Sequence, residues 1–363
     1  MKIILVGTCL GVGGAERVMV DLADAYVKLG HEVRLVALTG PIHLRPRNSN
    51  VNIVCLQAKG VLDVLSTAWK LRQEIADFRP DVVHAHLFHA IVFTRLIRLI
   101  IHLPKLVTTV HSTRVGSPFR RFFYRATERL SDVSTSVSEE VALQFLDQNA
   151  AGSRPLLVLY NGIALEQFRR IESAHHDVVK ELGLDVKTKL IVSVGRLEPA
   201  KDYPNLLFAL ALLKDSGSQF VAIVVGEGSL RESLEEQVLS LGLANRVHFL
   251  GIRSDICRLL SAADIFVLSS AWEGLPMAVG EAMACECTVV ATDCGGVREL
   301  LADAGFLVPP KNPQLLADNL QRVLCLSDAE RKQIGTTARE RVQRRFSLDA
   351  SVGRWLEIYG HSS

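Results

Sequence analysis

Two carboxylates flank an expected helix start in the run Trp272–Met283. Pro276 suits the first position of a helix, where its missing N–H costs nothing, so we expect Glu273 in the preceding loop and Glu281 inside the helix. Backbone N–H groups at a helix start favour a phosphate. Two carboxylates would repel that phosphate unless they face sugar or ribose hydroxyls. The N–H groups concerned belong to Gly274, Leu275 and Met277. A structural interpretation, with Glu273 as a helix-start charge and Glu281 on the surface, stays open.

Two cations follow an expected strand at Leu190–Val194. Arg196 and Lys201 lie just past its carboxyl end, in the run Gly195–Asp202. A guanidinium and an ammonium at the same edge can together neutralise a diphosphate. Separately, each would be an ordinary solvated charge.

Glycines follow expected strands in three places. Gly11–Gly14, with Gly13 and Gly14 next to a helix start, lets the backbone approach a ligand closely. It is not the dinucleotide pattern G-x-G-x-x-G, because the third glycine position is Glu16. The run Gly226-Glu227-Gly228 and the single Gly251 lie at two further strand ends. A phosphate or a sugar hydroxyl fits such places, and so does a simple turn.

Short β-branched runs alternate with amphipathic runs along the chain, which predicts doubly wound α/β domains with mostly parallel sheets. The alternation pauses after Asn161-Gly162 and restarts at Leu190. We therefore expect an N-terminal domain over 1–165, a linker over 166–186 and a C-terminal domain over 187–345. Ligands in such sheets bind beyond the carboxyl ends of the strands, so two such domains facing each other would form a cleft.

The composition excludes several classes of protein. The 363 residues carry 41 Lys+Arg, 39 Asp+Glu and 48% hydrophobic residues, as in an ordinary globular protein. A net charge of +2 argues against a dedicated nucleic-acid binder. No apolar run reaches the length of a membrane span. The seven cysteines, without an export signal, indicate free thiols in a reducing cytosol. Neither they nor the histidines His84, His86 and His89 form a convincing metal site.

The charge is unevenly distributed. Residues 1–165 carry 19 basic and 13 acidic side chains, whereas residues 166–363 carry 22 and 26. Much of the first excess lies in residues 91–130, where aromatic residues separate the basic ones. A basic segment of this kind can sit on an anionic membrane surface, although an ordinary solvated helix face is the alternative. The arginines concerned include Arg114, Arg120, Arg121 and Arg125.

These motifs, in this order, resemble the retaining GT-B glycosyltransferases of family 4, which include many bacterial polysaccharide and lipid-glycan enzymes. The resemblance spans nearly the whole chain. Its further motifs are Pro80–His86, Val110-His111-Ser112 and Asn161-Gly162, in addition to the Glu273-x7-Glu281 spacing. One departure is Glu286, which falls about where a helix-ending glycine would be expected.

The resemblance implies a role for each motif. Arg196 and Lys201 would bind the donor diphosphate, Glu281 the ribose hydroxyls and Glu273 the transferred sugar, beside His111. The remaining donor contacts would come from Gly226, Glu227, Gly251 and the segment Gly274, Leu275, Pro276 and Met277. Gly13 and Gly14 would approach the donor phosphate or the acceptor. The arginines of residues 114–125 would lie on the membrane and acceptor side. The resemblance also implies that a helix at about 346–360 packs back on the first domain, and that no metal or other cofactor is needed.

The expected function is retaining transfer of a hexose or N-acetylhexosamine from a nucleotide sugar, in particular a UDP sugar, to a glycan acceptor that is lipid-linked. The enzyme would be cytoplasmic and peripheral on the inner face of the cytoplasmic membrane, in bacterial surface polysaccharide synthesis. We infer no nucleic acid and no obligate protein partner. A non-catalytic nucleotide-sugar-binding or scaffold subunit and a GT-B sugar-nucleotide epimerase are the alternatives.

Overall fold

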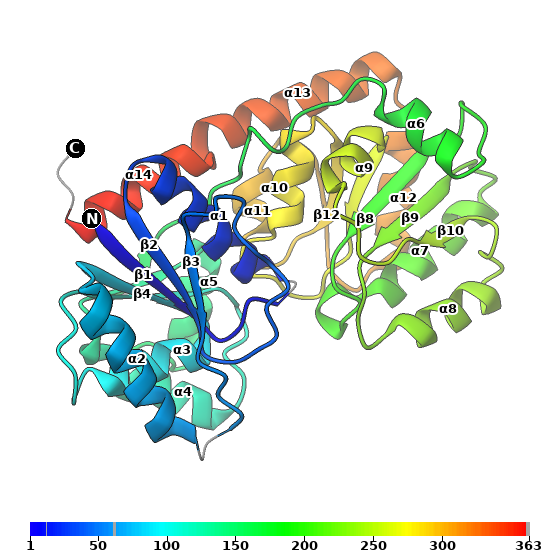
Figure 1. The fold of residues 1–363 in the computed structure, drawn as a ribbon. Helices are drawn as coiled ribbons and strands as arrows, with labels where there is room; N and C mark the ends of the chain where they lie inside the picture. Colours follow the sequence, from blue (N-terminus) through cyan, green and yellow to red (C-terminus); the bar gives the residue numbers. More distant parts are fainter. Residues whose placement is uncertain (12, 61–62, 361–363) are drawn as a thin grey trace. The chain divides into compact units, whose positions relative to one another are not determined.

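The computed structural model describes residues 1–11, 13–60 and 63–360, and the chain forms two compact units. The first consists of Met1–Gly162 together with Leu348–Ser363, and the second of Ile163–Ser347. Figure 1 shows the blue and cyan strands of the first unit and the green and yellow strands of the second as two separate sheets.

The first unit contains a parallel sheet in which seven described strands have the order β3-β2-β1-β4-β5-β6-β7. This order reverses direction beside β1, as in doubly wound nucleotide-binding folds. The central strands are buried, because helices cover the sheet; β1 is an apolar run, whereas β4, β5 and β6 also carry buried His, Thr and Ser side chains. Their bounds are β1 Lys2–Gly7, β2 Glu32–Ala37, β3 Asn52–Cys55, β4 Val82–His86, β5 Leu106–Val110, β6 Val133–Ser136 and β7 Leu157–Val158.

The helices of the first unit include the C-terminal helix of the chain. That helix, α14, packs against α1, and the hydroxyl groups of Tyr26 and Tyr359 join the two at 3.1 Å. Trp355 of α14 is buried in the same place. The bounds are α1 Gly14–Lys28, α2 Val64–Phe78, α3 Phe88–Ile97, α4 Pro118–Thr127, the 3-10 turn η2 Glu128–Leu130, α5 Glu139–Asp147 and α14 Leu348–Tyr359.

The second unit contains a parallel sheet in which six described strands have the order β10-β9-β8-β11-β12-β13. The strands are β8 Leu190–Val194, β9 Val221–Val225, β10 Val247–Phe249, β11 Ile265–Leu268, β12 Thr288–Thr292 and β13 Phe306–Val308. The helical elements are α6 Ala174–Glu181, η3 Pro199–Lys201, α7 Tyr203–Asp215, α8 Arg231–Ser240, α9 Ile256–Ala262, α10 Met277–Ala284, α11 Val297–Leu301, α12 Pro313–Leu324 and α13 Asp328–Arg345.

The polar stretch that we expected as a linker is folded. Residues 174–181 form α6, which packs on α9 within the second unit. Its buried residues are Ala174, Val178 and Val179, at helical spacing among charged neighbours. The high polarity of the stretch concealed this narrow apolar stripe.

The helix end at Glu286 has the geometry that normally selects glycine. Glu286 has a positive φ of 59°, and its N–H and that of Cys287 bond to the carbonyls of Met283 and Ala282. These two bonds form a Schellman motif at the end of α10. The turn is therefore retained with glutamate in the left-handed position, and Gly335 of α13 packs directly on the Glu286 carbonyl.

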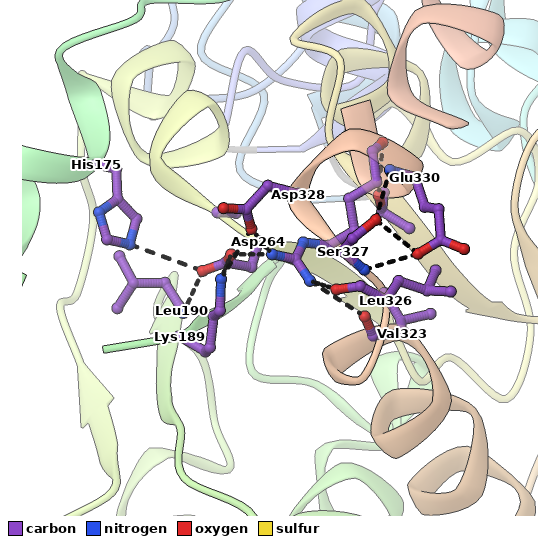
Figure 2. A network of polar contacts seen from close by, with 12 residues as sticks. His175, Lys189, Leu190, Asp264, Val323, Leu326, Ser327, Asp328 and Glu330 are labelled. Atoms are coloured by element: carbon purple, nitrogen blue, oxygen red, sulfur yellow. Dashed lines mark hydrogen bonds and ion pairs between the residues drawn. The ribbon is translucent and has the colours of Figure 1, made fainter. Parts of the chain in front are cut away.

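A polar network ties together the amino ends of β8 and β11 (Figure 2). Asp264 lies just before β11. It accepts a hydrogen bond from the Leu190 backbone at 2.9 Å, and it pairs with Lys189 at 3.0 Å and with buried Arg331 at 3.5 Å. Arg331 belongs to α13, so the network anchors that helix to the sheet. The edge concerned is the one opposite the carboxyl ends, where ligands bind in such folds.

Candidate active site

The expected donor residues follow two neighbouring strands of the second sheet. Lys201 follows β8 and Glu273 follows β11, and these strands pair in parallel although the chain between them forms β9 and β10. The strand order therefore reverses between β8 and β11. Ligands in doubly wound sheets bind at such a point.

Lys201 and Glu273 form an ion pair there. Their Nζ and Oε1 atoms are 2.5 Å apart, and the side chains are only 20% and 13% exposed. The hydroxyl of Ser270 also donates to Glu273 Oε1, at 2.6 Å. An ammonium has three N–H groups, so Lys201 can hold Glu273 while it donates to a phosphate oxygen. The sequence analysis expected both residues at this edge but not their direct contact.

Backbone contacts fix the two loops against each other. Ser269 donates to the Lys201 carbonyl at 2.8 Å, and the Ala271 N–H donates to the Ala200 carbonyl at 2.9 Å. On the other side, Gly295 has a φ of 55° and lies so close to Glu273 that a Cβ there would be 2.2 Å from the Glu273 carbonyl oxygen. The loop after β12 therefore packs directly on the backbone of Glu273.

Gly195 and Gly226 stack at the ends of β8 and β9. Gly226 has a φ of 139°, and a Cβ there would lie 2.0 Å from the Gly195 carbonyl oxygen, so the position requires glycine. The same carbonyl accepts a hydrogen bond from the hydroxyl of buried Tyr203, at 3.2 Å. Burial raises the pKa of Tyr203, which keeps this donor protonated. The first turn of the loop is thus rigid up to Arg196.

Arg196 itself is exposed, and it has no ion pair among the described residues of this chain. Its guanidinium differs in this respect from the neutralised Lys201. Glu227 lies at the end of β9, where it pairs with Arg231 at 3.0 Å, and Gly251 lies beside its carboxylate. These residues are at the expected edge of the sheet, and their contacts with a donor remain a prediction.

Helix α10 begins one residue later than expected, since Pro276 is its N-cap and has extended backbone angles. Gly274, Leu275 and Met277 are buried in this loop and helix start, and the Gly274 carbonyl accepts from the Gly296 N–H at 2.7 Å. Glu281 lies about one turn into the helix and is partly exposed. No side chain caps the start of α10.

In the first unit, the glycine loop lies at the start of α1, whose N-cap is Gly13 and whose first residue is Gly14. Val12, the second residue of this motif, is outside the described residues. The carboxylate of Glu16 folds back over Gly13, where an added Cβ would lie within 2.4 Å of its Oε2 atom. A negative charge therefore already faces the helix start, which favours a hydroxyl over a phosphate as the ligand there.

His111 lies directly after β5 and is partly exposed. Its Nε2 atom is 2.9 Å from Nδ1 of His86, which is fully buried at the end of β4. The ring of His84 stacks on that of His86, and both of its nitrogens bond to hydroxyls, those of Tyr359 and Thr109. His84 is therefore structural.

The basic segment forms α4 and the turn before it. Arg114, Arg120 and Arg125 are exposed and Arg121 is partly exposed. Phe119 and Phe122 of the same helix are 66% and 65% exposed. Aromatic and cationic side chains therefore share an exposed helix, which is the pattern expected of a surface that meets a membrane.

The sequence did not reveal the residues that contact the loops of Lys201 and Glu273. Ser270, Tyr203 and the Gly295-Gly296 turn all contact the loops of Lys201 and Glu273. Gly295-Gly296 follows the short apolar run that forms β12, so its position was a usable signal. Nothing in the sequence distinguishes Ser270 from any other loop serine.

Within the described residues, no group of three or more His, Cys, Asp or Glu side chains is arranged to hold a metal ion. All seven cysteines are free thiols. None of the described helices is both long and apolar enough to cross a bilayer.

Two doubly wound units with parallel sheets, together with the similarity to solved glycosyltransferase structures, fit the GT-B fold. Residues 176–341 match the family model described as Glycosyl transferases group 1, and residues 12–167 match Glycosyltransferase Family 4. The chain belongs to the family 4 glycosyltransferases, which confirms the fold and the enzyme class predicted from the sequence.

Relatives of established activity span most of the chain. It is 25% identical to the N-acetyl-alpha-D-glucosaminyl L-malate synthase of Bacillus anthracis, over 99% of this chain and 97% of that protein. It is 27% identical to the UDP-Gal:alpha-D-GlcNAc-diphosphoundecaprenol alpha-1,3-galactosyltransferase of Escherichia coli, over 77% and 75%. The Anabaena protein HepE in complex with UDP and glucose superimposes with a TM-score of 0.83, at 25% identity and 100% coverage of both chains.

Proposed function

We propose that this protein transfers a hexose or N-acetylhexosamine from a UDP sugar to a lipid-linked glycan, with retention of the anomeric configuration and without a metal ion. The observation that carries the proposal is the Lys201–Glu273 pair at the switch point of the second sheet. It combines a cation for a diphosphate with a carboxylate for sugar hydroxyls. The UDP complex of HepE and the diphosphoundecaprenol acceptor of the Escherichia coli relative support the choice of donor and acceptor.

The donor diphosphate binds Lys201 and Arg196 in this proposal. Charge–phosphate hydrogen bonds of this kind replace the divalent ion that other transferases use, because they neutralise the same oxygens. Glu281 accepts from ribose hydroxyls, and Glu273 accepts from hydroxyls of the transferred sugar. The contacts with Lys201 and Ser270 hold the Glu273 carboxylate in one orientation. The buried start of α10 adds backbone N–H groups to the phosphate site.

The chemistry is a substitution on one face of the sugar. The bond between the anomeric carbon and the phosphate oxygen breaks, and its electron pair leaves with UDP. The acceptor hydroxyl forms the new bond on the same face and gives its proton to the departing phosphate oxygen. Lys201 and Arg196 stabilise the charge that develops on that phosphate, so their largest effect is on the transition state.

The acceptor side is assigned to the first unit. Gly13 and Gly14 approach a hydroxyl there, because Glu16 already supplies the negative charge at the start of α1. The exposed arginines and phenylalanines of α4 hold the enzyme on the anionic inner face of the cytoplasmic membrane. That location gives access to an acceptor on a lipid carrier.

Release of UDP from UDP-sugar donors tests the proposal, with a panel of lipid diphosphate-linked sugars as acceptors and excess chelator in every assay. We expect acceptor-dependent release that Lys201→Ala and Glu273→Ala each lower by at least about 100-fold in kcat/KM. The control variant Lys189→Ala removes an equivalent charge at the opposite edge of the sheet and should retain activity. Transfer that requires added magnesium, or near-normal turnover in both site variants, would contradict the proposal.

Membrane binding has a separate test by sedimentation with vesicles. Vesicles that contain phosphatidylglycerol should retain the protein, and purely phosphatidylcholine vesicles should not. Replacement of Arg120, Arg121 and Arg125 by glutamine should release it, because each basic residue near such a surface contributes about 1 kcal/mol. Equal binding to both vesicle types would count against the proposed location.

A further inference from the structure

Hydrogen bonds and one ring contact connect His111 to the C-terminal helix of the first unit. His111 Nε2 lies 2.9 Å from His86 Nδ1, and the ring of His86 stacks on that of His84 with centroids 4.0 Å apart. His84 Nδ1 lies 2.6 Å from the hydroxyl of Tyr359 in α14, and His84 Nε2 lies 2.6 Å from Thr109 Oγ1.

Strand register brings these side chains together. His84 pairs with Val107 and His86 with Thr109 in the parallel β4–β5 ladder. Side chains alternate between the faces of a sheet, so Thr109 and His111, two residues further on, share the face of the two histidines. The sheet therefore fixes the spacing of the chain.

The hydrogen-bonding state of His86 selects one arrangement of protons. Its Nε2 atom is buried and has no hydrogen-bond partner among the described residues. If His111 donated to His86 Nδ1, neutral His86 would carry its proton on Nε2, as a buried N–H without an acceptor. The reverse arrangement leaves only a bare lone pair there. Orphaned buried N–H groups are rare in proteins, whereas an unpartnered acceptor is tolerated more often.

Both rings are neutral near pH 7. Burial lowers the pKa of His111 to about 4, and burial together with the two neighbouring histidines lowers the pKa of His86 well below its ordinary value. Each ring therefore has one N–H, and a proton on His86 Nδ1 makes His111 Nε2 an acceptor. The remaining proton of His111 then resides on Nδ1.

We propose that His86 is a positioning residue that holds His111 in the Nδ1–H tautomer, so that His111 can donate this N–H to an oxygen of a substrate. The inference rests on the proposed function for the identity of that oxygen, but not for the tautomer. The ring of His84 packs against that of His86, and hydrogen bonds to Tyr359 and Thr109 fix the orientation of His84. No carboxylate takes part among these contacts, so the arrangement supplies a neutral donor rather than a general acid.

Long-range 1H–15N correlation spectra of the full-length protein labelled with 15N-histidine test the tautomer directly. His111→Gln identifies the signals of His111. We expect wild-type His111 to be protonated on Nδ1 and bare on Nε2, whether or not a donor is present. A spectrum with the proton of His111 on Nε2 would overturn the inference.

Two variants of His86 test the positioning role with UDP-glucose as the donor probe. His86→Leu removes the donor to His111, so the Nε2–H form should appear and kcat should fall about 10-fold, with a smaller change in KM. His86→Asn can place an amide N–H near the former Nδ1, so it should retain the Nδ1–H form and rescue most of kcat. Normal kcat and an unchanged spectrum in His86→Leu would overturn the proposal. If His86→Leu fails to fold, the wild-type spectrum and the kcat of His86→Asn decide it.

Failure of this inference is distinguishable from failure of the proposed function. Absence of transfer with every donor and acceptor would refute the function, while the tautomer is still read from the free protein. Conversely, normal transfer by a protein whose His111 carries its proton on Nε2 would refute only the inference. In that case, the rate of UDP release from UDP-glucose analogues that each lack one hydroxyl would not depend on His86.

Discussion

Gly335 in the middle of α13 is the position where one added methyl group should be most informative. A Cβ there would lie 2.0 Å from the carbonyl oxygen of Glu286 and 2.7 Å from its carbonyl carbon. These are backbone atoms of the turn that ends α10, so no flexible side chain can move aside. Gly335→Ala must therefore separate α13 from the end of α10.

The expected change in stability follows from two opposing effects. Alanine within a helix is favoured over glycine by about 1 kcal/mol, whereas overpacking of a closed contact costs about 1–3 kcal/mol and more when the backbone is involved. The second effect is larger here, because the overlap exceeds an ångström. We expect a net loss of about 2 kcal/mol, which lowers the melting temperature of the second unit by about 4–8 °C.

Gly353→Ala is the matched control. Gly353 lies inside α14, it is exposed, and a Cβ there would meet no atom within 4 Å. This variant should gain about 0.5–1 kcal/mol for the first unit from helix propensity alone. Calorimetry of the wild type and both variants measures the two transitions. A Gly335→Ala protein as stable as the wild type would refute the argued contact between α13 and Glu286.

Substitutions at three further positions test the stability of the units. Burial is the main cause that raises the pKa of Asp21 from 3.8 to about 6, so the folded state binds an extra proton between these pH values. The free energy of unfolding therefore falls by about 3 kcal/mol as the pH rises through that window. Asp21→Asn should therefore stabilise the protein by about 1–3 kcal/mol above pH 7 and by nothing below pH 4 in urea titrations; a gain that persists at pH 3.5 would contradict this cause. Glu286→Gly should stabilise by about 0.5–1 kcal/mol because the left-handed position strains any residue with a Cβ, and Glu286→Ala should bring no such gain in the same melts. Asp264→Ala should lower the free energy of unfolding by about 3 kcal/mol, because exposed Asp328 is then the one remaining ion-pair partner of the buried charge of Arg331 among the described residues; a loss below 1 kcal/mol in urea unfolding would disprove that role.

The position of the site could be predicted because parallel strands place their loops at one edge. Lys201 and Glu273 are 72 residues apart, yet each follows an apolar run that reads plainly as a strand. Their mutual contact could not be predicted, since it depends on which strands are neighbours and on the Gly295 turn that packs on the Glu273 backbone. Strand order is set by packing of the whole unit, which no local pattern encodes.

The histidine chain sets a second limit to prediction. The two-residue spacing of His84 and His86 indicates that both side chains lie on one face of a strand. The partner that fixes His84 is Tyr359, 275 residues further along the chain. Because that contact exists only when α14 packs in the first unit, the separate roles of the two histidines follow from tertiary structure alone.

Strands β8 and β11 carry two polar clusters with different purposes at their opposite ends. At the amino ends, Asp264 and Asp328 together neutralise Lys189 and Arg331 through contacts that involve only the chain itself. At the carboxyl ends, Lys201 is neutralised by Glu273, but Arg196 is exposed and has no ion pair among the described residues. A cluster that is complete within the protein stabilises the fold, whereas an excess cation at a strand end is available to an anion. Substitutions at the two ends should therefore separate the two properties: Asp264→Ala lowers stability and leaves the affinity for UDP intact, whereas Arg196→Ala lowers that affinity and leaves stability intact.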